Sequence, residues 1–362
     1  MIITEVQLPL FRKLNSVTKS SIKLLLCLLF FSHLDSSVYV KEDLIYQDKP
    51  PKKLSEYGFF QDMNNQIPSD KVLPYDLISP LFSDYADKLR FIYIPENKTA
   101  AYRHNKVFDF PNGTALIKTF AYLNNYQNSN ISKQLLETRL LIKKNNEWVN
   151  VSYIWNDDQN DAFLSIAGKT ISTKFVNEYG NLVDVRYRVP NINQCKECHT
   201  SNKKITPIGP KARNLNKSFN YFEGSKNQLM KWHQMGWVEN NLNIKSMVDW
   251  QDKSKDLNDR ARSYLDINCA HCHIDGGSAD TSGLILDYLE SKKINLGIYK
   301  KPVATGRASN NLRYSIVPGK PDESILLYRM QSLDPGIMMP ESGRYLEHTE
   351  AVELINKWIK NL

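Results

Sequence analysis

The 362-residue sequence predicts an α+β multidomain protein, with an N-terminal antiparallel β-rich domain followed by mainly α-helical segments. Two observations predict this arrangement. Between residues 59 and 190, short apolar and aromatic runs alternate with turn residues, which is typical of antiparallel sheets. Beyond residue 225, apolar residues recur at helical spacing instead. The length suits two or three domains.

The β-rich part contains a series of strand-like runs separated by turn signals such as Pro111-Asn112-Gly113. This pattern predicts an antiparallel sandwich or barrel. The many aromatic residues here fit ordinary core packing better than a ligand groove. The expected strands are residues 89–94, 114–122, 140–142, 148–155 and 183–189.

The C-terminal part predicts amphipathic helices. A Pro-Asp-Glu sequence at residues 321–323 supplies favourable first-turn chemistry for one of them. In the last segment, Val352, Ile355 and Ile359 fall on one face of a helix. The expected helices lie within residues 225–237, 257–265, 321–330 and 349–362.

Two short motifs carry the chemistry of the chain, Cys195-Lys-Glu-Cys198-His199 and Cys269-Ala-His-Cys272-His273. Each is a C-x-x-C-H sequence, the attachment signal for a c-type haem. The two sulfurs bond to the vinyl groups on one edge of the porphyrin, and the adjacent histidine reaches the iron. We therefore expect two covalently attached haem c groups, with His199 and His273 as proximal ligands.

A zinc site is the alternative for these cysteines, because two C-x-x-C pairs can hold one tetrahedral metal ion. Zinc sites do not require a histidine directly after the second cysteine. Here a histidine follows in both motifs, although the chain has only seven histidines. The sequence therefore favours haem over zinc.

The N-terminal segment resembles an export signal. Four basic residues up to Lys23 precede a short apolar run over residues 24–31, and small polar residues follow. The run is too short to span a bilayer, so we expect a periplasmic or secreted bacterial protein without an integral membrane span. An uncleaved N-terminal anchor is the alternative. Cys27 lies inside this run and does not fit a lipoprotein cysteine, because Leu26 precedes it.

Charge gives little indication of a partner. The net charge is +8, and removal of residues 1–37 takes away four basic and two acidic groups and leaves +6. Two haems add up to four propionate carboxylates, which brings the protein close to neutral. A solvated lysine-rich surface explains the remaining charge better than a nucleic-acid partner does.

Residues 255–362 resemble a class I cytochrome c. The resemblance includes the second motif, Ser282-Gly-Leu-Ile-Leu286, the Pro-Gly-Lys-Pro-Asp sequence at 318–322, and the closing helix with Trp358. It implies that Met339, in the sequence Met338-Met339-Pro340, is the distal ligand opposite His273. A thioether is a soft donor that favours ferrous iron. Met338 is the alternative ligand.

The first motif departs from that pattern, because no Met-Pro loop follows it before residue 257. The sequence Pro207-Ile-Gly-Pro210 lies where class I cytochromes place a carbonyl that orients the proximal imidazole. His233 is the preferred sixth ligand, and an open iron is also compatible with the sequence. His271 lies within the second motif and is not expected to bind iron. The other candidate ligands are Met230, Met235, Met247 and His104.

Over most of its length, the chain resembles an uncharacterised family of secreted bacterial di-haem c-type cytochromes. Matching blocks include residues 73–85, 108–114, 136–141, 153–159, 191–195 and 207–216. The expected organisation is a signal peptide (1–37), a linker (38–58), a β-rich domain (59–190), a first haem-binding segment (191–250) and a class I-like cytochrome c domain (255–362).

The resemblance implies a di-haem electron carrier that transfers single electrons between a periplasmic donor and an acceptor, both unknown redox partner proteins. One alternative is a di-haem peroxidase-like enzyme, in which one iron opens to peroxide. Another is a β-rich binding module that carries haem. The sequence leans towards a carrier that is not itself an enzyme, and no catalytic residue is assigned.

Overall fold

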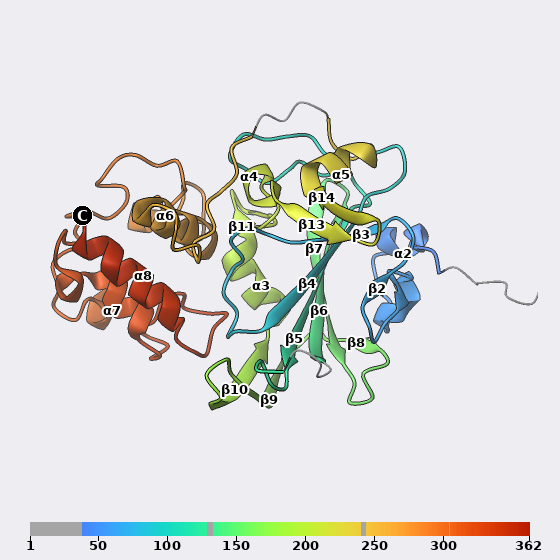
Figure 1. The fold of residues 1–362 in the computed structure, drawn as a ribbon, viewed down its shortest axis with the longest axis horizontal. Coiled ribbons are helices and arrows are strands. Elements are labelled where there is room, and N and C mark those ends of the chain that lie inside the picture. The colour runs from blue at the N-terminus through green and yellow to red at the C-terminus, as the bar shows by residue number, and fades with distance from the viewer. Residues whose placement is uncertain (1–37, 129–132, 240–243, 304) are drawn as a thin grey trace, which may run out of the picture. The chain divides into compact units, whose positions relative to one another are not determined.

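The structure, a computed structural model, describes residues 38–128, 133–239, 244–303 and 305–362. The expected signal peptide and Cys27 lie outside these residues. The described chain is mixed α and β and is mostly β-rich (Figure 1). None of the helices in the described part is long and apolar enough to cross a lipid bilayer.

A six-stranded antiparallel sheet forms the centre of the β-rich part (Figure 1). Its strands follow each other in chain order, so the topology is a simple meander rather than two packed sheets. The strands are β3 (Val72–Tyr75), β4 (Asp87–Tyr93), β5 (Ala115–Leu123), β6 (Lys133–Lys144), β7 (Glu147–Trp155) and β8 (Ala162–Leu164). A separate hairpin pairs β9 (Lys169–Val176) with β10 (Leu182–Val189).

Side chains on β5 alternate between the two faces of the sheet. Ala115 and Ile117 pack into one apolar core. Leu116 packs into a second core on the other face, and Phe120 and Tyr122 pack into a third beside the β9–β10 hairpin. This alternation explains why β5 is apolar along nearly its whole length, since both of its faces are covered. Lys118 interrupts the apolar pattern on the second face, between Leu116 and Phe120.

Residues 38–58, expected to be a linker, contribute to the fold. They contain α2 (Glu42–Tyr46) and the 3-10 helix η1 (Leu54–Tyr57). Ile45, Leu54 and Tyr57 are almost completely buried in the first core. The prolines and lysines of this segment predicted an exposed linker. Its apolar residues instead bury their side chains, and this burial holds the segment against the sheet.

Smaller elements follow the β9–β10 hairpin. They are α3 (Ile192–His199), the hairpin β11 (Thr200–Ser201) to β12 (Lys204–Ile205), α4 (Ala212–Leu215), the hairpin β13 (Ser218–Tyr221) to β14 (Gly224–Asn227), and α5 (Gln228–Gln234). Before the central sheet in the chain, β1 (Phe60–Asp62) and β2 (Ile67–Pro68) form a separate two-stranded sheet. The helix expected over residues 225–237 is therefore shorter, because residues 224–227 form a strand.

Helices dominate the C-terminal part. α6 (Leu257–Asn268), α7 (Ile325–Gln331) and α8 (Thr349–Lys360) share one apolar core that includes Leu265, Ile355 and Trp358. Three short 3-10 helices connect them, η2 (Asp280–Ser282), η3 (Gly306–Ser309) and η4 (Pro321–Glu323). α6 and α8 pack against each other, as do α7 and α8. These helices occupy the positions that the sequence predicts.

Asp266 on α6 links the helical part to the segment after the first motif. Its carboxylate is fully buried and accepts hydrogen bonds from Lys211 and Arg213 and from the backbone N–H of Tyr288, which lies 3.0 Å away. Burial alone raises the pKa of Asp266, but the charges of Lys211 and Arg213 and their hydrogen bonds outweigh it and lower the pKa below 3.8.

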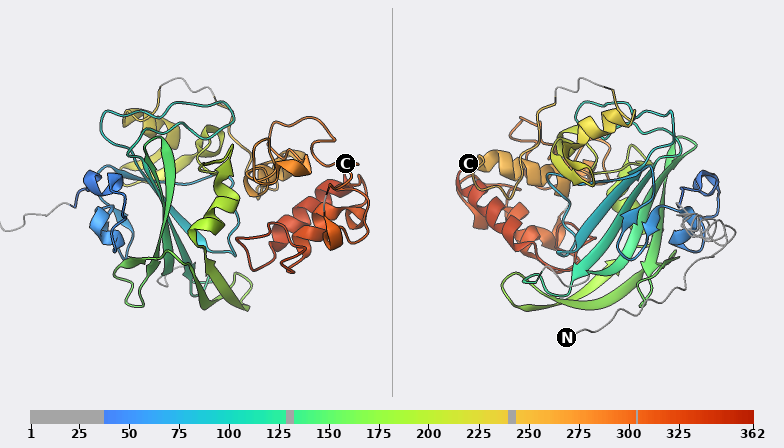
Figure 2. Two further views of the ribbon diagram at one scale, coloured as in Figure 1. Left: turned by 180° about the vertical axis from the view of Figure 1, so that it is seen from behind. Right: turned by 45° about the vertical axis from the view of Figure 1, so that its right-hand side comes forward.

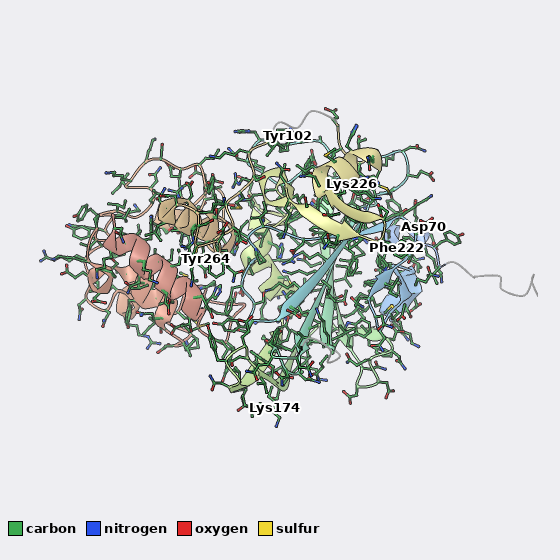
Figure 3. All side chains as sticks on the ribbon, in the orientation of Figure 1. Asp70, Tyr102, Lys174, Phe222, Lys226 and Tyr264 are labelled. Carbon is green, nitrogen blue, oxygen red and sulfur yellow. The ribbon has the colours of Figure 1, made fainter. Side chains whose placement is uncertain are left out.

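A second group of contacts joins residues 82–85 to the helical part. The backbone N–H of Phe82 donates to Asn268 Oδ1 at 2.8 Å, and Asp84 Oδ1 accepts from the backbone N–H groups of Tyr345 and Leu346. The Phe82 ring stacks on His348, with ring centroids 4.0 Å apart. His348 is also hydrogen-bonded to Tyr264, the α6 residue labelled in Figure 3.

We predict that Asp266→Asn lowers the free energy of unfolding by about 3–5 kcal/mol, because it removes the buried carboxylate that pairs with the buried Arg213 and the partly buried Lys211. The folded-state pKa is lowered, so this stabilisation is present above the unfolded value of 3.8 and is lost as the pH falls through the folded pKa. Urea unfolding at neutral pH measures the loss. Glu353→Gln, which changes an exposed ion pair, is the control and should cost under about 1 kcal/mol.

Candidate functional site

The first motif occupies the last turn of α3. The helix begins with a capping box, in which the side chains of Asn191 and Gln194 each accept from the other's backbone N–H. Cys195 and Cys198 are one turn apart and therefore lie on the same side of the helix. Cys195 is buried and Cys198 is half-buried. The sequence folds this way locally because the cap fixes where the short helix starts.

The imidazole of His199 is oriented by a backbone carbonyl. Its Nδ1 lies 2.9 Å from the carbonyl oxygen of Thr206. A carbonyl can only accept, so Nδ1 carries the proton and Nε2 keeps its free electron pair. The carbonyl was expected from residues 207–210 and comes from the residue just before them. Burial lowers the pKa of His199 to about 4, so the ring is neutral at pH 7.

The second motif follows directly from the end of α6. Backbone N–H groups of Cys272 and His273 both donate to the carbonyl of Cys269, which closes a tight turn. His273 Nδ1 lies 2.9 Å from the hydroxyl of Ser282, which donates its own proton to the carbonyl of Ala279. The hydroxyl therefore accepts from Nδ1–H, and His273, like His199, has a free Nε2.

The two motifs lie next to each other. The donor atoms of Cys198, His271 and Cys272 are all within 4.8 Å of one another. The segments after the motifs also pair, since the backbone N–H of Asn202 donates to the carbonyl of Gly276 at 2.8 Å. The hydrogen bond from the Cys198 thiol is the main cause that lowers the pKa of Cys272. Cys198 and Cys272 are 74 positions apart in the sequence, and this spacing gave no sign of their closeness.

The four cysteines do not form a four-cysteine zinc site. Cys195 and Cys269 are not part of the close group, whereas such a site needs all four sulfurs around one point. All four cysteines are free thiols without a disulfide. Cys198, His271 and Cys272 by themselves form a group that could hold a metal ion.

Met339 lies in a loop that comes close to both motifs. Its backbone N–H donates to the carbonyl of Arg329 at 2.9 Å, and its side chain is partly exposed, whereas that of Met338 is buried. The charges of Arg329 and Glu341, on either side of this loop, both act on His273. Met339 is therefore the more accessible of the two methionines.

The structure does not bring His233 to the first motif. This side chain is exposed on α5, and its Nδ1 lies 3.1 Å from the carbonyl oxygen of Val238. α5 packs on the apolar core around Trp232, away from α3 (Figure 2). Met230 and His104 are exposed as well, Met247 is buried beside Arg213, and Met235 packs on the Trp232 core. The expectation for His233 rested on helix spacing, which does not specify where a helix packs.

Positive side chains from the sheet act on the first motif instead. Lys118 and Arg139 are among the charges that lower the pKa of His199, and Arg139 also acts on Cys195. α3 packs against β7, beside the strand that carries Arg139. Neither residue belongs to a sequence motif. The feature that could have pointed to Lys118 is its position as a lysine in the middle of an otherwise apolar strand.

Comparison with known protein families, characterised proteins and solved structures finds no match to this chain.

We predict that the two neighbouring thiols form a disulfide when the haem-free protein is oxidised with diamide under native conditions. The product should link Cys198 to Cys272, because these sulfurs are close and the Cys272 thiolate is favoured. Peptide mass spectrometry identifies the link. A link between Cys195 and Cys198 as the main product would contradict the observed packing, and Cys272→Ser is the control that should remove the predicted link.

Proposed function

We propose that this protein is a di-haem c-type cytochrome that transfers single electrons. The observation that carries the proposal is the contact between two C-x-x-C-H motifs, whose second cysteines lie within 4.8 Å of each other. Two redox groups attached at these sulfurs have neighbouring edges. Such an arrangement suits the passage of electrons from one group to the next.

The residues fit a covalent haem at each motif. The four thiols are free. Each histidine is neutral and held by a hydrogen bond at Nδ1, which leaves Nε2 as the metal-binding atom. Thr206 and Ser282 therefore act as orienting groups, and Cys195, Cys198, Cys269 and Cys272 as attachment points. A bound haem supplies a one-electron Fe(III)/Fe(II) couple.

The two sites differ in their surroundings. At the second site, we propose Met339 as the distal ligand. We propose that residues 255–362 form a class I-like cytochrome c domain. At the first site, the described charges closest to His199 include Lys118, Arg139 and His271 rather than His233. A difference in ligands gives the two irons different potentials and therefore sets a direction for the electron.

A di-haem peroxidase-like enzyme is the second candidate function. The exposed position of His233 favours this second function, because the first iron would then lack its expected sixth ligand and would be open. In either case, we propose an exported bacterial protein whose donor and acceptor are redox partner proteins of unknown identity.

We predict that the protein purified from cells with a cytochrome c maturation system contains two covalent haems. The mass should rise by two haems over the polypeptide, and acid-acetone extraction should leave the colour in the protein. The physical reason is the thioether bond at each motif. Purified protein with zinc in place of iron would contradict the proposal.

We predict that Met339→Ala abolishes the near-infrared sulfur-to-iron band and lowers the midpoint potential of one haem, because a ligand that favours ferrous iron is removed. Met338→Ala is the matched control and should keep the band, since Met338 is buried. Loss of the band in Met338→Ala alone would transfer the ligand assignment to that residue.

A further inference from the structure

Three positive side chains stand side by side on one face of the central sheet. Arg90 on β4 is paired with Lys118 on β5, and Lys118 is paired with Arg139 on β6. Residues directly opposite in an antiparallel pair have side chains on the same face, about 5 Å apart. We call Arg90, Lys118 and Arg139 the cation row. It spans three adjacent strands and therefore about 10 Å.

The cation row has too few anions for its charge. Arg90 is bonded to Asp76 at 2.9 Å, and Arg139 is bonded to the fully buried Glu137. Among the described residues, the ammonium group of Lys118 has no hydrogen bond or ion pair, and its contact is the ring of Phe120, 4.7 Å away. Like charges directly opposite in a sheet destabilise it, so the arrangement needs a further negative group.

The surroundings of Lys118 are hydrophobic on both sides. Leu116 and Phe120, two positions before and after it on β5, belong to separate apolar cores. Burial, followed by the charges of Arg90 and Lys88, lowers the pKa of Lys118 well below its usual value. Lys88 lies on the same face of β4, two residues before Arg90, and adds a fourth cation to the region.

The cation row lies beside the helix of the first motif, because α3 packs against β7, and β7 pairs with β6, the strand that carries Arg139. Arg139 is the member that acts on both Cys195 and His199, and Lys118, one strand further, acts on His199. Arg90 is one strand further again. A c-type haem is attached through its vinyl edge and carries its two propionate carboxylates on another edge of the ring. The cation row thus places positive charge beside the first motif, where an attached haem would bring its two carboxylates.

We propose that Lys118, flanked by Arg90 and Arg139, binds a propionate carboxylate of the haem attached at Cys195 and Cys198. The inference rests on the proposed function and specifies how the sheet takes part in it. The β-rich domain then forms one wall of the first haem site. It neutralises the haem carboxylates and raises the potential of that iron, since nearby positive charge stabilises the reduced form.

The test uses the full-length holoprotein with Lys118→Met, which keeps the length of the side chain and removes the charge. We expect the reduction equilibrium constant of the first haem to fall roughly tenfold, which for a one-electron couple is about 59 mV. The first haem is the one whose potential is unaffected by Met339→Ala. The propionate-bending band of that haem in resonance Raman spectra should also shift, which a charge acting only at a distance would not cause.

Controls separate the proposal from its alternatives. Lys174→Met removes a charge from an exposed lysine on β9, labelled in Figure 3, and should change neither the potential nor the band. Lys118→Arg should keep both near the wild-type values. Lys118→Gln serves as a second neutral variant if Lys118→Met does not accumulate.

Two results would overturn the proposal. One is an unchanged potential and propionate band in both neutral variants. The other is conversion of the first haem to a high-spin form in these variants, which would make the Lys118 amine an iron ligand. Failure of the proposed function is distinguishable, because the wild-type protein would then contain fewer than two covalent haems.

Discussion

The buried carboxylate of Asp266 holds the two motif-bearing parts of the protein together. It lies three residues before Cys269 and accepts hydrogen bonds from Lys211 and Arg213, which follow the first motif. A buried anion that pairs with a buried arginine and a partly buried lysine tolerates little displacement, because separating them leaves the charges of Asp266 and Arg213 uncompensated in the interior. The position of the second motif relative to the first follows from this constraint, together with the contacts of Phe82 and Asp84.

The closeness of Cys198 and Cys272 follows from the ion pairs of Asp266 and the contacts of Phe82 and Asp84. Each motif has its own local support: a capped helix and the carbonyl of Thr206 for the first, and the end of α6 with Ser282 for the second. These contacts orient each histidine, but they do not determine where the other motif lies. The ion pairs of Asp266 help to bring the two motifs together, which is the arrangement that the proposed electron transfer between them would need.

Sequence patterns were sufficient for elements with a regular period and for the two motifs. The strands around Lys118 and the helices α6 and α8 follow from alternation and from helical spacing. What could not be predicted depends on tertiary packing. His233 has helical spacing but lies exposed on a helix far from α3, and residues 38–58 have the composition of a linker but bury Ile45 and Leu54. Neither outcome is encoded within a local window of the sequence.

Lys118 shows where local and global preferences disagree. A lysine between Leu116 and Phe120, opposite two arginines, breaks the apolar pattern of a doubly covered strand and adds like-charge repulsion. Proteins retain such violations mainly at functional sites, where another interaction compensates. The compensating group has to be negative, has to reach the interior face of the sheet, and has to lie beside His199. A carboxylate of the haem that we propose at Cys195 and Cys198 would meet all three requirements, and the sheet would then form part of the proposed site.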